Sequence, residues 1–210
     1  MPDDALLDAA DRGVLDAELP QQVARMLSDP RSSAFVRSFS TQWLQIQRLD
    51  SFVADNQLFP SFDPKLKSAM MRETELFFDA VLRENRSVLE LIDADYTFLN
   101  EPLAKHYGIA DTQGNWIGQP ASKPGGSALQ GETFQRVSLQ DRNRGGVITQ
   151  ASVLSVTSNP TRTSPGKRGK WILEQFLGSP PPPPPPNVPE LPDRKSTRLN
   201  SSHTVISYAV

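Results

Sequence analysis

Three dipeptides that pair a helix-capping residue with proline constrain the fold of this chain more than any other feature. Asp29-Pro30, Asp63-Pro64 and Ser164-Pro165 each stand just before an apolar series with helical spacing. A side-chain oxygen at such a position accepts a hydrogen bond from the first turn, and proline fits the first helical position because no N–H is needed there. We therefore predict that a helix starts at each of the three sites.

Apolar residues recur every three or four positions through the first half of the chain, which is typical of amphipathic helices. The helix after Asp63 is expected to end near Asn85, and Ser87 is expected to cap a short helix behind it. Residues 100–107 are expected to form a further helix that Gly108 closes. The pattern indicates a bundle of helices in series.

The second half of the chain has a different composition. Residues 110–133 are rich in Gly, Gln, Ser and Pro, as surface loops are. Residues 134–139 alternate apolar and polar side chains and are expected to form a short strand. Gly145-Gly146 then opens the apolar stretch 147–156, whose pattern fits either a helix or a buried strand.

The predicted fold class is mainly α, with a helical bundle followed by a smaller loop-rich helical unit, a polyproline segment and a disordered tail. The expected divisions are a helical domain of unknown function at 1–109, a loop or linker at 110–133, a second domain of unknown function at 134–179, a polyproline spacer at 180–192 and the tail at 193–210.

Composition excludes several classes of site. The 210 residues include no cysteine, so this stretch cannot hold a disulfide, a thiolate zinc site, an iron–sulfur cluster or covalently attached haem. The net charge of −2 lacks the basic footprint of a nucleic-acid-binding protein, so no nucleic-acid partner is expected. No stretch approaches the roughly 20 apolar residues of a membrane span, and no transmembrane segment is expected.

His106 is the only histidine of the chain outside the tail. Near the end of its helix it can interact favourably with the helix dipole, and this structural interpretation is preferred. The catalytic alternative would combine Asp93, Asp95 and His106 in an active site that other segments complete. Metal binding would also need Glu101 or these aspartates, and their spacing matches no metal motif, so no metal site is predicted.

The remaining carboxylates are interpreted structurally. An Asp-x-Asp pair between helices, such as Asp93 and Asp95, is typical of caps and turns. Glu73 and Glu75 lie in a charged stretch of the helix after Asp63, and both are expected to be solvated.

Residues 159–171 combine hydroxyl groups, glycines and four cations, Arg162, Lys167, Arg168 and Lys170, at a helix start. Backbone N–H groups at a helix start favour anions, whereas the positive end of the dipole disfavours those cations. The spacing of glycine, lysine and hydroxyl residues is not that of a P-loop. A capped basic turn is the preferred interpretation, and an anion-binding site is the alternative.

The tail from Asp193 shows no apolar period and no cap that connects it with the preceding chain. Translated back into codons, DRKSTRLNSSH resembles a common sequencing adapter, and ISYAV resembles the continuation of that adapter. We therefore expect residues 193–210 to be an artefact and offer neither His203 nor Tyr208 as a site residue.

Four segments carry a resemblance to known families. Residues 1–4 (MPDD), 39–49 (FSTQWLQIQRL) and 95–109 (DYTFLNEPLAKHYGI) resemble an uncharacterised planctomycete domain of unknown function. Residues 144–186, which begin RGGVITQASVLSV, resemble the domain that follows it. In these families MPDD lies inside a domain, so we expect a fragment that is truncated at both ends.

The resemblance implies a large, exported bacterial parent protein that often carries a planctomycete-type cytochrome c module. It implies an extracytoplasmic location, other domains of the parent chain as partners, and haem c only in missing parts of the parent. Three functions stay open: a structural or interaction module, part of an enzyme whose active site lies partly elsewhere, and an anion- or carbohydrate-binding module that uses residues 159–170.

Overall fold

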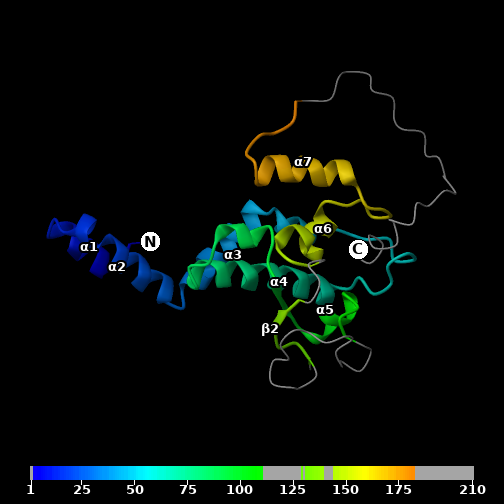
Figure 1. The fold of residues 1–210 in the computed structure, drawn as a ribbon, viewed down its shortest axis with the longest axis horizontal. Coiled ribbons are helices and arrows are strands. Elements are labelled where there is room, and N and C mark those ends of the chain that lie inside the picture. The colour runs from blue at the N-terminus through cyan, green and yellow to red at the C-terminus, as the bar shows by residue number, and fades with distance from the viewer. Residues whose placement is uncertain (1, 111–128, 130, 140–143, 183–210) are drawn as a thin grey trace.

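A computed structural model describes residues 2–110, 129, 131–139 and 144–182 of the chain (Figure 1). Helices dominate these residues and confirm the mainly α prediction. The α-helices are α1 (Asp4–Asp11), α2 (Leu15–Ser28), α3 (Ser32–Trp43), α4 (Pro64–Arg83), α5 (Glu101–His106), α6 (Ala151–Val156) and α7 (Pro165–Gln175). The 3-10 helices are η1 (Ile46–Leu49), η2 (Val88–Leu91) and η3 (Val147–Thr149), and the strands are β1 (Tyr96–Leu99) and β2 (Gln135–Ser138).

Two of the three predicted helix starts are confirmed. The Asp63 carboxylate accepts from Leu66 N at 2.7 Å at the start of α4. The Ser164 hydroxyl accepts from Lys167 N at 3.4 Å at the start of α7. The prediction at Asp29-Pro30 is wrong by two residues, because Asp29 accepts from Arg31 N in a preceding turn and α3 begins afterwards.

Helices α1 and α2 form an arm that projects from one end of the molecule (Figure 1). The Asp3 carboxylate caps α1 by accepting from Leu6 N at 3.2 Å, and α2 has no buried residue at all. Pro20 stands inside α2, which begins at Leu15. The arm contacts the rest of the molecule through α3 and through Arg83 of α4, whose Nη1 donates to Leu27 O at 2.5 Å.

The predicted strand at 134–139 is present as β2, and it pairs antiparallel with β1. Tyr96 lies opposite Ser138 and Leu99 lies opposite Gln135. The sequence did not predict β1, because its four residues directly precede the helix that was expected at 100–107. The stretch 147–156 is helical, in η3 and α6, so the strand alternative for it is wrong.

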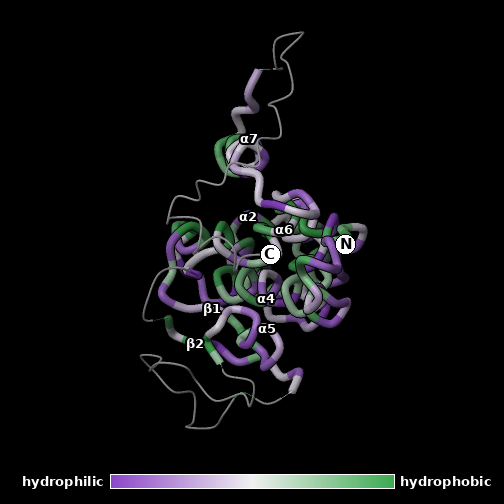
Figure 2. The backbone as a smooth tube through the Cα atoms, turned by 90° about the vertical axis from the view of Figure 1, so that its right-hand side faces the viewer, coloured by the Kyte–Doolittle hydropathy of each residue, from purple (hydrophilic) through white to green (hydrophobic). Residues whose placement is uncertain are grey.

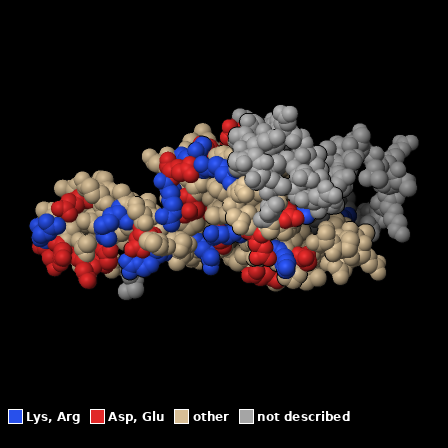
Figure 3. All heavy atoms as spheres, turned by 90° about the horizontal axis from the view of Figure 1, so that it is seen from below, with Lys and Arg blue, Asp and Glu red and all other residues tan. Residues whose placement is uncertain are grey.

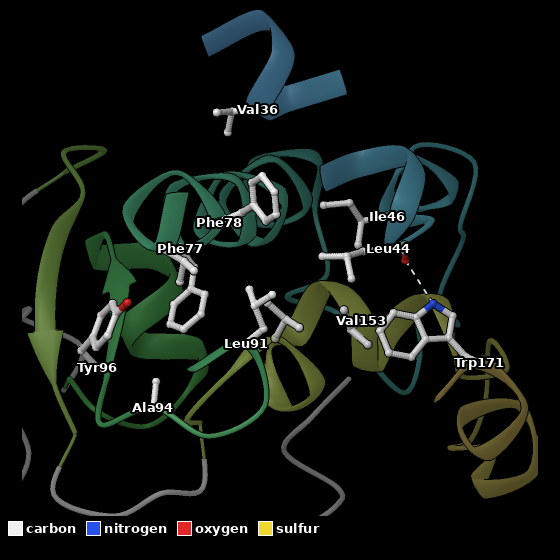
Figure 4. Close-up of a cluster of buried hydrophobic side chains, with 12 residues drawn as sticks. Val36, Leu44, Ile46, Phe77, Phe78, Leu91, Ala94, Tyr96, Val153 and Trp171 are labelled. Atoms are coloured by element: carbon white, nitrogen blue, oxygen red, sulfur yellow. Dashed lines mark hydrogen bonds between the residues drawn. The ribbon is translucent and has the colours of Figure 1, made fainter. Parts of the chain in front are cut away.

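Two hydrophobic clusters form the core, and both draw on the chain before and after residues 110–133. In the first cluster, Phe77 and Leu91 pack with Val153 and Trp171 (Figure 4). In the second, Met70 and Leu103 pack with Ala151, Val156 and Val137. In Figure 2, segments of hydrophobic residues gather around α4, which contacts α3, β1, α5 and α6.

Two tryptophans tie α7 to the end of α3 in a reciprocal manner. The Trp171 indole of α7 donates to Leu44 O at 3.1 Å, as Figure 4 shows. The Trp43 indole of α3 donates to Gln175 O at 2.9 Å. The buried Trp171 and the partly buried Trp43 thereby each satisfy the indole N–H on the other segment.

The backbone at Gly145-Gly146 touches the backbone of the turn before β1 so closely that no side chain fits. A Cβ at Gly145 would lie 2.1 Å from Ala94 O, and one at Gly146 would lie 2.4 Å from Ile92 O. Gly146 also has a φ of +82°, which L residues rarely adopt. The two halves of the chain therefore meet backbone to backbone at this point.

Candidate functional site

A fully buried carboxylate lies where the two halves of the chain meet. Glu73 occupies the middle of α4 with no exposed surface. The Thr97 hydroxyl of β1 donates to Glu73 Oε1 at 2.5 Å, and the Tyr107 hydroxyl donates to Glu73 Oε2 at 2.5 Å. Each carboxylate oxygen thus has one donor, supplied by a different element.

Tyr107 extends this contact to the second half of the chain. Its hydroxyl accepts from Ala151 N at 2.8 Å, so it supplies a partner for the first backbone N–H of α6. The Arg144 guanidinium carbon lies 4.4 Å from the centre of the Tyr107 ring, and Arg144 Nη1 donates to Thr149 O at 3.2 Å. Glu73, Tyr107 and Ala151 therefore form a continuous polar bridge from α4 to α6.

Burial raises the pKa of Glu73 to about 7, because the charged form loses its hydration inside the core. The hydroxyl donors from Thr97 and Tyr107 and the positive charge of Arg144 lower this pKa, but less than burial raises it. Burial also raises the pKa of the Tyr107 hydroxyl well above its usual value. Glu73 is therefore the group of this site that exchanges a proton near neutral pH.

A second buried polar contact joins α4 to α6 directly beside the first. The Thr74 hydroxyl donates to Gln150 Oε1 at 2.7 Å, and the Thr74 and Ser152 oxygens are 2.6 Å apart. All three residues are fully buried. Gln150 Nε2 and Ser155 Oγ have no hydrogen-bond partner among the described residues. Such a polar layer specifies how the two helices pack, because a shifted register would leave more groups unsatisfied.

The prediction that Glu73 and Glu75 are solvated is wrong. Glu73 is 0% exposed and Glu75 is 6% exposed. The helical period contained the signal for Glu73, because it lies on the same stripe as the buried residues Leu66, Met70 and Phe77. The prediction that Glu73 is solvated rested on the charge of its side chain alone. Glu75 is compensated by Arg72 at 2.8 Å and by Arg37 at 3.5 Å.

The catalytic candidates named from the sequence lie in different environments. Asp93 and Asp95 are exposed in the turn before β1. His106 is largely buried at the end of α5, and its Nε2 has no hydrogen-bond partner among the described residues. Burial and the neighbouring Arg144 lower the pKa of His106 to about 4. The imidazole is therefore neutral near pH 7 and does not offer the positive charge that a helix dipole would favour.

The structure divides the four cations of the predicted anion site. Lys167 and Lys170 line a groove of about 240 Å³ together with Arg48 of η1, which the sequence analysis did not single out. Arg162 and Arg168 do not line this groove. Arg168 is half-buried, and its Nη2 has no hydrogen-bond partner in the described part of the chain. Lys170 lies 3.6 Å from Glu174, the one carboxylate of the groove.

Across the described ranges, no cluster of three or more His, Asp or Glu residues is placed to hold a metal ion. Among the same residues, no helix combines the length and the apolar character that crossing a membrane requires.

Comparison with protein families assigns both halves of the chain. Residues 1–109 match the model of PSD4, described as a protein of unknown function (DUF1592). The chain belongs to the PSD4 family. Residues 144–207 match PSCyt3, also described as a protein of unknown function (DUF1588). No curated protein and no solved structure matches the chain.

The two matches confirm the resemblance to two consecutive uncharacterised domains, and they locate the polar bridge. The PSD4 segment supplies Glu73, Thr97 and Tyr107, and the PSCyt3 segment supplies Arg144 and Ala151. The PSCyt3 match extends past the expected boundary at residue 193, as far as residue 207. Residues 183–210 lie outside the described residues, so the polyproline and adapter assignments stay predictions.

Proposed function

We propose that this chain is a structural and interaction module of a larger, exported bacterial protein that also carries cytochrome c domains. In this function the PSD4 and PSCyt3 segments form one rigid body that holds neighbouring domains at fixed positions. The chain itself carries out no electron transfer. Haem c belongs to other parts of the larger protein, and the location is extracytoplasmic.

One observation supports the rigid body above all others, namely the continuous core between the two family segments. Phe77 of the PSD4 segment and Trp171 of the PSCyt3 segment belong to the same buried cluster. The bridge from Glu73 through Tyr107 to Ala151 N adds directional contacts to this core. Independent domains usually meet through smaller and more polar interfaces. A unit with a shared core suits a spacer.

The cytochrome c setting is supported by the family name PSCyt3 and by the resemblance of both segments to planctomycete domains. The absence of cysteine from the 210 residues is consistent with haem attachment elsewhere, because covalent haem needs a cysteine pair.

The proposal is tested in the larger protein by Gly146→Val, which disrupts the backbone contact between the segments. We expect the haem absorption spectrum to be unchanged, whereas chemical cross-links between the domains that flank the module are lost. Gly169→Val, on an open face of α7, is the matched control and should keep the cross-links. If Gly146→Val unfolds the module and the cross-links between the flanking domains are nevertheless unchanged, the spacer function is refuted.

The groove at α7 favours a second candidate function, the binding of small anions. Arg48, Lys167 and Lys170 converge there from two elements, and Glu174 is the single opposing charge. Calorimetric titration with sulfate, phosphate and glucuronate tests this function. Lys167→Ala with Lys170→Ala should remove binding, whereas Lys65→Ala with Arg12→Ala should preserve it at the same net charge. Binding that survives the first double substitution excludes the groove.

A further inference from the structure

The arm formed by α1 and α2 and the helix α3 that follows it expose several large apolar side chains. Five large apolar side chains of α1, α2 and α3 are each about half exposed, namely Leu7 at 50%, Leu19 at 48%, Val23 at 48%, Phe35 at 51% and Phe39 at 45%. Leu19 and Val23 share one face of α2, because residues four apart are neighbours on a helix. Exposed apolar surface on this scale marks an interaction site.

A groove lies between the arm and the start of α3, and Phe35 is the one of these five residues that lines it. Its volume is about 840 Å³, within the range of ligand and peptide sites. Met26, Leu27 and Phe35 supply apolar lining. The carboxylates of Asp3, Asp4 and Asp29 also line the groove, together with Arg31, which pairs with Asp29 at 2.6 Å. The groove is therefore apolar in part and mainly acidic in its charged lining.

The arm, like the charged lining of the groove, is mainly acidic. Residues 3–28 contain six carboxylates and two arginines. Arg25 pairs with Asp3 at 2.7 Å and Arg12 pairs with Glu18 at 3.4 Å. Asp4, Asp8, Asp11 and Asp16 have no ion pair among the described residues, and Figure 3 shows acidic side chains gathered at the outer end of the arm.

We propose that this groove is a docking site for a basic amphipathic segment of another protein or protein domain. Apolar side chains of the segment would pack against Met26 and Phe35. Its Lys or Arg residues would face Asp4, the one carboxylate of the lining that has no ion pair with a described residue, and Asp8 one turn further along α1. The charge argues against two other occupants. A second copy would bring an equally acidic arm, and an anionic lipid surface would repel these carboxylates. The inference deepens the proposed function by naming the surface through which the module meets a neighbour.

A synthetic peptide with Leu on one helical face and Lys on the other is a suitable probe. Its binding to the intact chain is measured by fluorescence anisotropy of an attached dye. We expect binding that weakens with added salt, and no binding of the same peptide with Glu in place of Lys. Phe35→Ser should weaken binding about tenfold or more, because it removes an apolar wall of the groove. Asp4→Asn with Asp8→Asn should weaken binding and reduce its salt dependence.

Leu58→Ser is the matched control, because Leu58 is 57% exposed in the loop before α4 and far from the groove in sequence. Equal losses for Phe35→Ser and Leu58→Ser would overturn the proposal. The proposal would also be overturned if the chain associated with itself, or bound phosphatidylcholine vesicles, and Phe35→Ser abolished that association or binding. Failure of the peptide to bind would leave the shared core intact, so it would count against the docking site and not against the proposed spacer function.

Discussion

At the scale of single residues, the burial of Glu73 makes the stability of the molecule depend on pH. Its pKa is about 7 in the folded chain and close to 4.5 when exposed. The folded state therefore binds this proton more tightly than the unfolded state does. The resulting stabilisation is complete below about pH 4.5 and is lost as pH rises through about 7. Tyr107 and Arg144 face the same carboxylate, and Tyr107 keeps its proton throughout this window.

We expect the unfolding free energy of the natural chain to fall by about 2 kcal/mol from this group between about pH 5 and about pH 8. Glu73→Gln should lack this fall, because an amide does not titrate and both hydroxyls can rotate to pair with it. Denaturant titrations of both proteins across this range measure the difference. Parallel curves would show that Glu73 does not titrate in this window.

Gly146 limits the approach of the two family segments. Gly146→Ala should cost at least about 3 kcal/mol, because the new Cβ would meet Ile92 O at 2.4 Å at a positive φ. Gly169→Ala in α7 is the opposite case, since no atom lies within 4 Å of its Cβ. It should stabilise the chain by up to about 1 kcal/mol. Thermal unfolding compares the two, and equal effects would contradict the close backbone contact.

At the scale of elements, local signals were enough for several helices. Asp63, Ser87 and Asn100 each cap the helix that their sequence predicts, because a cap depends on residues within one turn. Strand β1 was not predicted, because its partner β2 is far along the chain. The start of α3 was misplaced because Asp29 bonds Arg31 N in a separate turn.

The cap of α4 has a measurable effect on stability. Asp63→Ala should destabilise the chain by about 1 kcal/mol, because it removes the acceptor for Leu66 N. Lys65→Ala, in the same turn and exposed, should change stability by less than about 0.3 kcal/mol. Chemical denaturation of both variants gives the comparison. Similar small losses would mean that packing alone defines the helix start.

At the scale of the whole molecule, the sequence predicted a mainly α chain, but it could not predict the core that the two family segments share. The division at residues 110–133 followed composition, and composition carries no information about which side chains meet in a core. The burial of Glu73 depends on the same long-range packing, since Thr97 and Tyr107 reach it from two other elements and Ala151 N in turn donates to the Tyr107 hydroxyl. The lack of cysteine and the net charge follow from composition alone, so they hold for the chain as a whole.

The central claim is that the PSD4 and PSCyt3 segments fold as one unit around this core. Native-state hydrogen exchange of the intact chain in increasing denaturant, read by mass spectrometry, tests it most directly. The slowest amides of α4 and of α6 are predicted to share one opening free energy and one denaturant dependence. Opening of α6 at a free energy lower than that of α4 by more than about 2 kcal/mol would contradict the shared unit.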